Sequence, residues 1–310
     1  MTREEFMIEK YKAFTENTLK NNMNFYTHPS TARTEPFRIA DNLYYVGDKK
    51  VCTHLLDTSD GLILIDSGYL GAEHLLVDSI WRAGFDPSDI KIILHTHGHS
   101  DHFGASQEFK RMYGCELVIS RIDADLVRRT NLATNLRPLA TAPTFDREIE
   151  DGDTVELGNV KIRCVLTPGH TEGVMSFFFD VSYNGEIYTA GLFGGVGTNA
   201  LTLPYTTKNG YDDTMPEKML ASIELLRKER VDIHLGNHPK NNNTFEKRAR
   251  QLAEGGNPFI DSESFPKLLD ELERKTRDII RENAKLLEQF NSQNNKDVTF
   301  GKTEKDRNNK

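Results

Sequence analysis

The chain alternates between short apolar runs that end at turn residues and longer segments with helical spacing. The runs LYYVG, VCTHLLDT and GLILIDSG are rich in β-branched or aromatic residues, which is typical of strands. LGAEHLLVDSIWRAG and GASQEFKRMYG have helical patterns, with Gly84 expected to end the first, and IKIILHT and CELVIS return to strand patterns. This alternation predicts helices packed on a sheet.

The middle of the chain is richer in strands. TVELGNVKIRCVLT, VMSFFFDV and GEIYTAG predict meandering antiparallel strands, and MPEKMLASIELLRKER, VDIHLG and NNNTFEKRARQLAEGG then predict a helix, a strand and a helix. A long charged amphipathic helix is expected over residues 262–290. We therefore expect an N-terminal arm over residues 1–35, one compact catalytic domain over 36–290 and a disordered polar tail over 291–310.

Composition narrows the classes of function. The 310 residues are 37% hydrophobic and carry a formal net charge of −8, which does not favour nucleic-acid binding. No apolar stretch approaches the length of a membrane span. The start MTREEFMIEK lacks the pattern of a signal peptide, so we expect a cytoplasmic protein. Cys52, Cys115 and Cys164 lie in apolar surroundings, which predicts buried free thiols.

The segment HTHGHSDH, residues 95–102, follows a predicted buried strand and concentrates metal-binding side chains. His97 and His99 are two residues apart and point the same way in extended backbone. Asp101 and His102 follow a turn and could serve a second metal. One short loop cannot complete two sites, so distant ligands are required. His170 in TPGHTEG and His238 in HLGNHPK lie at strand ends and can supply them.

The remaining polar residues near these motifs have simpler interpretations. Asp66 in LIDSG suits a turn or cap, and it could also hold the metal loop by hydrogen bonds without touching a metal. The other histidines are interpreted as ordinary surface or core residues: His28, His54, His74, His95 and His234.

The ordered motifs LILIDSG, HGHSDH, TPGHTEG and HLGNHP resemble the metallo-β-lactamase superfamily over roughly residues 36 to 290. EPFRIADNLYYVGD, AGFDPSDIKIILHTHGHSDHFGA and GNPFID are most similar to the third subclass of metallo-β-lactamases, which has an all-His/Asp dizinc site. The resemblance implies an α/β fold, a four-layer αβ/βα sandwich of two mixed sheets flanked by helices, with the metals at the strand ends between the sheets.

The resemblance also assigns ligands. His97, His99 and His170 match the first zinc site, and Asp101, His102 and His238 match the second. YTAGLFGG aligns with the segment that gives many superfamily hydrolases a bridging Asp, and Gly191 stands at that position. The third lactamase subclass also lacks this carboxylate. Glycine in place of the bridging Asp therefore favours the lactamase branch of the superfamily over the thioesterase and lactonase branches.

Two such metals imply a zinc-dependent hydrolase in which a metal-bridging hydroxide cleaves an acyl C–N or C–O bond and Asp101 orients the nucleophile. A β-lactam-like amide is the nearest family substrate. The alternatives are a lactonase or glyoxalase II-like thioesterase acting on a cytoplasmic metabolite, and a non-catalytic metal-binding protein. Iron or manganese could replace the two zinc ions, since His and Asp ligands do not select sharply.

Substrate choice in such folds lies in loops. The candidate pocket loops are RRTNLATNLRPLATAPTF and GGVGTNALTLPYTTKNGYDD, and the second contains four candidate contacts for a small-molecule substrate: Asn199, Thr202, Tyr205 and Tyr211. We expect no nucleic-acid or membrane partner, and the sequence leaves the oligomeric state open.

Overall fold

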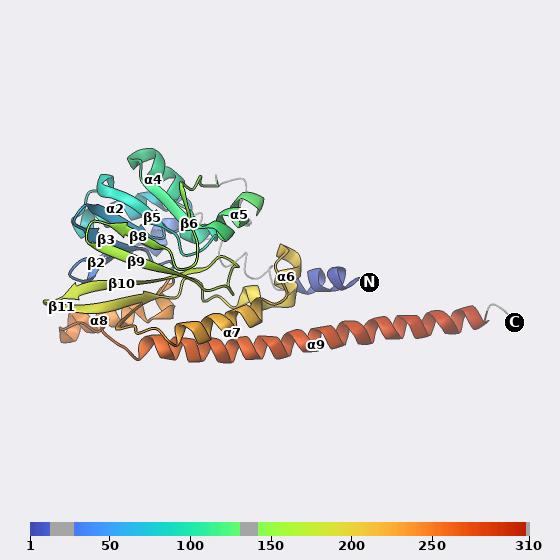
Figure 1. Ribbon diagram of the computed structural model, residues 1–310. Coiled ribbons are helices and arrows are strands. Elements are labelled where there is room, and N and C mark those ends of the chain that lie inside the picture. The colour runs from blue at the N-terminus through green and yellow to red at the C-terminus, as the bar shows by residue number, and fades with distance from the viewer. Residues whose placement is uncertain (13–27, 131–141, 308–310) are drawn as a thin grey trace.

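A computed structural model describes residues 1–12, 28–130 and 142–307, and for residues 130 and 294–307 only the backbone. Within these residues, twelve strands form two sheets, one of seven strands and one of five (Figure 1). In the first sheet the strands follow chain order: β1 Phe37–Ala40, β2 Leu43–Tyr45, β3 His54–Thr58, β4 Gly61–Ile65, β5 Ile90–Leu94, β6 Glu116–Ser120 and β7 Arg147–Ile149. Strands β1 to β4 pair antiparallel, and β4 to β7 pair parallel.

The second sheet has the order β12-β11-β10-β9-β8. Its strands are β8 Thr154–Leu157, β9 Val160–Leu166, β10 Met175–Tyr183, β11 Glu186–Leu192 and β12 Ile233–Leu235. Strands β8 to β11 form the antiparallel meander that the sequence predicts, and β12 adds in parallel to β11. Alternate residues of β9, namely Val160, Ile162 and Cys164, enter the core between the two sheets, as the period of two in a strand requires.

Helices cover the outer faces of both sheets. On the first sheet lie α2 Glu73–Ala83, α4 Ser106–Tyr113 and α5 Arg121–Thr130, and Leu76, Ile80 and Phe109 pack there against the strands. On the second sheet lie α7 Met215–Leu226 and the first part of α9 Ser264–Arg307, with Met219 and Phe265 packed against β10 residue Phe178. The result is the four-layer αβ/βα sandwich with two mixed sheets that the family resemblance implies (Figure 1).

The remaining elements are short or lie at the edges. They are η1 Pro29–Ala32, η2 Pro87–Asp89, α3 Ser100–Phe103, η4 Asn199–Leu201, α6 Leu203–Asn209, η5 Pro239–Asn241 and α8 Thr244–Glu254. Gly84 ends α2 in the left-handed conformation, as predicted. The three cysteines are buried free thiols, again as predicted.

Two expected segments differ from the structure. The prediction of a disordered tail over 291–310 was wrong as far as Arg307, because α9 continues through it. No proline follows Pro266 in this helix, and adding residues to an existing helix costs little. The candidate loop GGVGTNALTLPYTTKNGYDD also contains α6, with a proline in its first turn, where proline is favoured.

The N-terminal arm is packed in its helical part, residues 3–12. Phe6 and Met7 are buried against Leu203 of α6 and Phe290 of α9. The arm therefore supports α6 from outside the sandwich.

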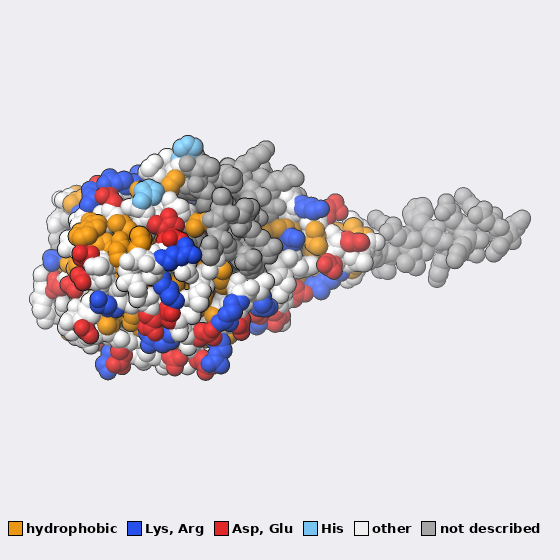
Figure 2. All heavy atoms as spheres, turned by 90° about the horizontal axis from the view of Figure 1, so that it is seen from above, with side chains coloured by type: hydrophobic (Ala, Val, Ile, Leu, Met, Phe, Trp, Pro, Cys, Tyr) orange, Lys and Arg blue, Asp and Glu red, His pale blue; other side chains and the backbone are white. Residues whose placement is uncertain are grey.

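The molecular surface mixes charges of both signs. Figure 2 shows acidic and basic side chains interspersed on one face, with neither sign forming a continuous field among the residues drawn in colour. Among the described helices, none has the length and apolar character that crossing a bilayer requires.

Candidate metal centre

The C-terminal ends of β5, β9, β11 and β12 bring four connecting segments to one edge of the sandwich. The first follows β5 and carries His97 and His99, and the short helix α3 that continues it carries Asp101 and His102. The second follows β9 and carries His170, and the third follows β12 and carries His238. The fourth follows β11 and contributes backbone carbonyls from Gly194 and Gly197. Residues up to 141 positions apart in sequence (His97 to His238) thus converge at one place.

The first group consists of His97, His99 and His170, with one nitrogen from each ring within 4.8 Å of the others. His99 Nδ1 and His170 Nε2 lie 2.9 Å apart. The outer nitrogens are held by carbonyls: His97 Nδ1 donates to Gly194 O at 2.9 Å, and His170 Nδ1 donates to Gly197 O at 2.8 Å. These bonds leave the Nε2 lone pairs of both rings turned toward the centre of the group.

The second group consists of Asp101, His102 and His238, within the same 4.8 Å limit. Asp101 Oδ2 lies 3.5 Å from His102 Nε2 and 3.7 Å from His238 Nε2. His102 Nδ1 donates to Asp66 Oδ2 at 2.7 Å, and His238 Nδ1 donates to Lys50 O at 2.7 Å. Each imidazole again presents Nε2 inward. The rings of His97 and His102 are 4.1 Å apart between centroids, so the two groups adjoin.

Asp66 joins β4 to the histidine loop, as the hydrogen-bonding interpretation of LIDSG predicts. Its buried carboxylate accepts from Thr96 N at 2.8 Å and from Thr96 Oγ1 at 2.8 Å, besides His102. The backbone of Asp66 has φ 61°, a conformation that few residues other than glycine, asparagine and aspartate adopt. In this strained backbone conformation, the Asp66 carboxylate reaches both Thr96 in the histidine loop and the ring of the ligand His102.

The electrostatics of the first group favour neutral imidazoles. Burial is the main cause that lowers the pKa of His97 and His170 well below the ordinary histidine value, and neighbouring imidazoles lower both further. Burial likewise lowers the pKa of His99 to about 4, against the opposing effect of Asp101. All three rings are therefore unprotonated near neutral pH, which is the state that binds a metal.

In the second group, the carboxylate of Asp101 and the imidazole of His102 stabilise each other's charged forms, and His238 adds a second imidazole. Burial opposes ionisation of Asp101, but His102, His238 and His99 outweigh it and lower the pKa of Asp101 to about 2. Burial also opposes protonation of His102, yet Asp101 and Asp66 raise the pKa of His102 above its ordinary value. A cation is thus stabilised between Asp101 and Asp66, whether it is a proton on His102 or a metal ion.

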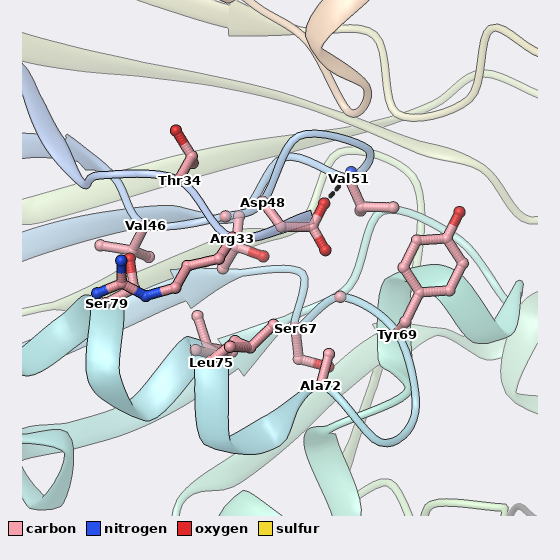
Figure 3. Close-up of a pocket in the computed structure, with 14 residues that line it drawn as sticks. Arg33, Thr34, Val46, Asp48, Val51, Ser67, Tyr69, Ala72, Leu75 and Ser79 are labelled. Carbon is pink, nitrogen blue, oxygen red and sulfur yellow. Dashed lines mark hydrogen bonds between the residues drawn. The ribbon is translucent and has the colours of Figure 1, made fainter. Parts of the chain in front are cut away.

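A tight turn before β3 fixes the ring of His238. Asp48 Oδ1 accepts from Lys50 N at 2.6 Å and from Val51 N at 2.8 Å, and Tyr45 Oη donates to the Asp48 carbonyl. Figure 3 shows the Asp48–Val51 bond at the wall of a pocket that Arg33, Ser67 and Tyr69 also line. The turn presents the Lys50 carbonyl to His238.

The donor set fits two divalent transition-metal ions. Nε2 of His97 and of His102 is buried with no hydrogen-bond partner in the structure. A buried nitrogen without a partner is costly, and a metal ion on it removes that cost. Three imidazoles, and two imidazoles with a carboxylate, are the ligand types that zinc prefers, with iron and manganese also able to use them.

The structure therefore brings all six predicted ligand residues together in the two predicted groups of three. His95, which belongs to the same motif but was interpreted as an ordinary residue, turns away: its Nδ1 donates to Val118 O and its Nε2 pairs with Ser106 Oγ.

The four predicted pocket residues lie around α6. Asn199 is exposed, and its Oδ1 lies 3.2 Å from the point that a Cβ on Gly197 would occupy, beside the His170 ring. Burial raises the pKa of Tyr205, and Tyr11 and Asp101 raise it further. Tyr211 contacts Tyr205, with 5.8 Å between ring centroids. Thr202 is the residue before α6, and its hydroxyl donates to Asn199 O in the preceding turn. Most of the other predicted loop, residues 131–141, lies outside the described residues.

The placement of Gly191 beside the metals was wrong. A Cβ on Gly191 would lie 2.5 Å from Val231 Cγ2 and 3.1 Å from Phe178 Cε1, in the layer between the second sheet and α7. The chain approaches the ligands later, where Gly194 and Gly197 supply carbonyls and where a Cβ on Gly197 would lie 2.4 Å from His170 Cε1.

We expect Gly197→Ala to weaken the first metal group by about tenfold or more, because the new methyl group must displace the ring of His170. Chelator competition measures the affinity. Gly191→Ala is the matched control: crowding against Val231 should cost about 1–3 kcal/mol of unfolding free energy and leave metal affinity unchanged. Equal metal affinity in both variants would contradict the assignment of the two glycines.

Sequence reasoning missed the residues that hold the ligand rings by backbone groups, namely Lys50, Gly194 and Gly197, and it missed Asp123 beneath the loops. A backbone carbonyl carries no residue-specific signal. Only GGVG, the glycine-rich stretch after β11, could have indicated a close approach of backbone to a site.

Comparison with known proteins places this site in a family. Residues 47–182 match the family model described as the metallo-beta-lactamase superfamily. The crystal structure of BJP-1, a subclass B3 metallo-beta-lactamase of Bradyrhizobium japonicum, superposes with a TM-score of 0.76 and 28% identity, over 86% of this chain and 99% of that one.

Curated relatives match shorter segments. A hydroxyacylglutathione hydrolase of Chelativorans sp. (strain BNC1) is 30% identical over 129 residues, 42% of this chain and 43% of the relative, so less than half of that relative's length is matched. An N-acyl homoserine lactonase of Bacillus thuringiensis is 24% identical over 220 residues, 60% of this chain and 80% of the relative.

Proposed function

The chain belongs to the metallo-beta-lactamase superfamily, and we propose that it is a metal-dependent hydrolase that opens an acyl C–N bond of the β-lactam kind. The observation that carries the proposal is the pair of adjoining three-ligand groups, with no residue of either group missing. A non-catalytic metal-binding protein would not need two adjoining groups of ligands.

His97, His99 and His170 would hold one metal ion, and Asp101, His102 and His238 the other. When bound, two such ions lower the pKa of water and polarise an acyl carbonyl. The Asp66 carboxylate and three backbone carbonyls hold the outer nitrogens of four of the five imidazoles and keep those rings in one tautomer and one orientation: His97, His102, His170 and His238. The chain therefore presents its ligands without the need for rearrangement.

Asp101 contributes to the reaction as well as to binding. Its side chain is 24% exposed, so one carboxylate oxygen can accept a hydrogen bond from an incoming water and direct the lone pair of that water at the substrate. Its low pKa keeps Asp101 ionised and ready to accept.

The pocket residues suit a small acyl compound. The exposed amide of Asn199 beside His170 can donate to a developing oxyanion. Tyr205 and Tyr211 stay protonated because burial raises their pKa values, so they offer an apolar wall with neutral hydroxyl groups.

Two observations favour the C–N bond over its alternatives. The structural likeness to a subclass B3 metallo-beta-lactamase extends over 86% of this chain and 99% of that one. The segment after β11 approaches the site with Gly194, Gly195 and Gly197, and none of them offers the carboxylate that the thioesterase and lactonase branches carry. Lactone or thioester hydrolysis remains the second candidate, which the lactonase and hydroxyacylglutathione hydrolase matches support.

The test is a hydrolysis screen of the zinc-loaded protein against a β-lactam, an N-acyl homoserine lactone and a hydroxyacyl thioester of glutathione. We expect the highest kcat/KM on the β-lactam, with loss of the activity on chelation and its return when zinc is added. A higher kcat/KM on the lactone or thioester would move the protein to that branch. No hydrolysis by a protein shown to hold two metals would contradict the proposal.

A further inference from the structure

One buried carboxylate outside the two ligand groups touches both loops of the first group. Asp123 lies in the first turn of α5, at the end of β6, and is 0% exposed. It contacts Gly98, which stands between His97 and His99, and Thr171, which follows His170. Neither Asp123 nor its partners binds a metal in the assignment above.

The contacts are short and use both carboxylate oxygens. Asp123 Oδ2 accepts from Gly98 N at 2.6 Å and from Thr171 Oγ1 at 2.6 Å. Asp123 Oδ1 accepts from Gly173 N at 2.9 Å. A single side chain thus fixes the loop after β5 to the loop after β9. These are the two loops whose ligand atoms, His99 Nδ1 and His170 Nε2, lie 2.9 Å apart.

The surrounding residues are shaped for this contact. A Cβ on Gly173 would lie 2.6 Å from Asp123 Oδ1 and 2.5 Å from Ser120 Oγ, so only glycine allows this approach. Ser120 Oγ accepts from Asp123 N at 3.1 Å and fixes the start of α5. Thr171 is itself 0% exposed, and its hydroxyl points to Asp123.

Burying this carboxylate is unfavourable in itself. Its three hydrogen-bond donors are uncharged, and burial raises the pKa of Asp123 to about 6 against the effect of those donors. An apolar residue would fill the same space without that cost, but it could not hold two backbone N–H groups and a hydroxyl. The presence of a buried carboxylate at position 123 is therefore explained by the three donors that it binds, not by packing.

We propose that Asp123 is a positioning residue that sets the spacing of the two loops of the first metal group, and with it the metal affinity and geometry of that group. Its catalytic consequence rests on the proposed hydrolase function, whereas its effect on metal binding does not depend on any substrate.

The test uses Asp123→Asn and Thr171→Val in the full chain. Asn keeps the shape of Asp but turns an N–H group toward the donors of Gly98 or Gly173, and Val keeps the shape of Thr without the hydroxyl. Asp146→Asn is the matched control: Asp146 also accepts from a backbone group, Leu117 N at 2.9 Å, but it contacts neither ligand loop through the bonds described.

Cobalt titration followed by absorption, with chelator competition, reports each group separately. We expect Asp123→Asn to weaken the first group by about tenfold to a hundredfold and to shift its cobalt spectrum. Thr171→Val should shift the same signals less, and the signals of the second group should stay unchanged. Asp146→Asn should match the wild type.

A folded Thr171→Val protein with an unchanged cobalt spectrum and affinity would overturn the inference, even if Asp123→Asn failed to fold. Equal weakening of both metal groups would also overturn it, because it would indicate a general structural role. Failure of the wild-type protein to bind cobalt would instead contradict the proposed function itself.

Discussion

Replacing Asp101 with Asn is expected to lower kcat/KM for hydrolysis by at least about a hundredfold, because one change removes a ligand and the acceptor that orients water. Asp101 Oδ2 lies 3.5 Å from His102 Nε2 and 3.7 Å from His238 Nε2, so an amide nitrogen there would face a group that should hold a cation. Elemental analysis should find about one metal ion per chain in the variant against two in the wild type.

The control for this variant is Asp125→Asn. Asp125 lies on the exposed face of α5, where it pairs with Arg128. An exposed ion pair of this kind contributes little to stability, so activity and metal content should stay at wild-type values. If Asp101→Asn retained two metals and more than half of the wild-type kcat/KM, Asp101 would have neither role.

The six ligand residues could be predicted because they are histidine and aspartate side chains that follow the ends of predicted strands. HGHSDH follows β5, and His170 and His238 follow β9 and β12, so the positions of the strands in the sequence were enough to bring them to one edge. Asp66 was predictable for the same reason, since it directly follows β4, which pairs with β5.

The placement of Gly191 failed because strand periodicity is two residues. Leu192 faces the core between the two sheets, whereas its neighbour Gly191 faces Val231 and the helical layer. A shift of one residue moves a position to the opposite face of a sheet. Glycine has no side chain whose polarity could reveal the error, so the motif alignment alone could not decide between the two faces.

The supporting contacts could not be predicted because they join distant segments through groups that every residue has. His238 is held by the carbonyl of Lys50, 188 positions away, and Asp123 reaches Gly173, 50 positions away. Local patterns carry no information about such pairs. The helix α6 was missed for a different reason, because its few apolar residues do not repeat long enough to indicate a helix.

Replacing Asp66 with Ala is expected to lower the free energy of unfolding of the metal-free protein by roughly 3 kcal/mol, because three buried donors, Thr96 N, Thr96 Oγ1 and His102 Nδ1, lose their acceptor. The φ of 61° adds strain for alanine. Asp66→Asn should destabilise less, since asparagine tolerates this φ and keeps one acceptor oxygen.

Metal binding separates the two roles of Asp66. Both variants remove the anion behind His102, whose pKa is raised by Asp101 and Asp66 against the effect of burial. Affinity of the second group should therefore fall about tenfold to a hundredfold in Asp66→Asn as well as in Asp66→Ala, although only the alanine variant loses much stability. Urea unfolding and chelator competition measure the two effects independently. Parallel losses of stability and affinity in both variants would mean that Asp66 acts on the metal only through the fold, whereas an affinity loss in a stable Asp66→Asn protein would follow from its charge beside the His102 ring.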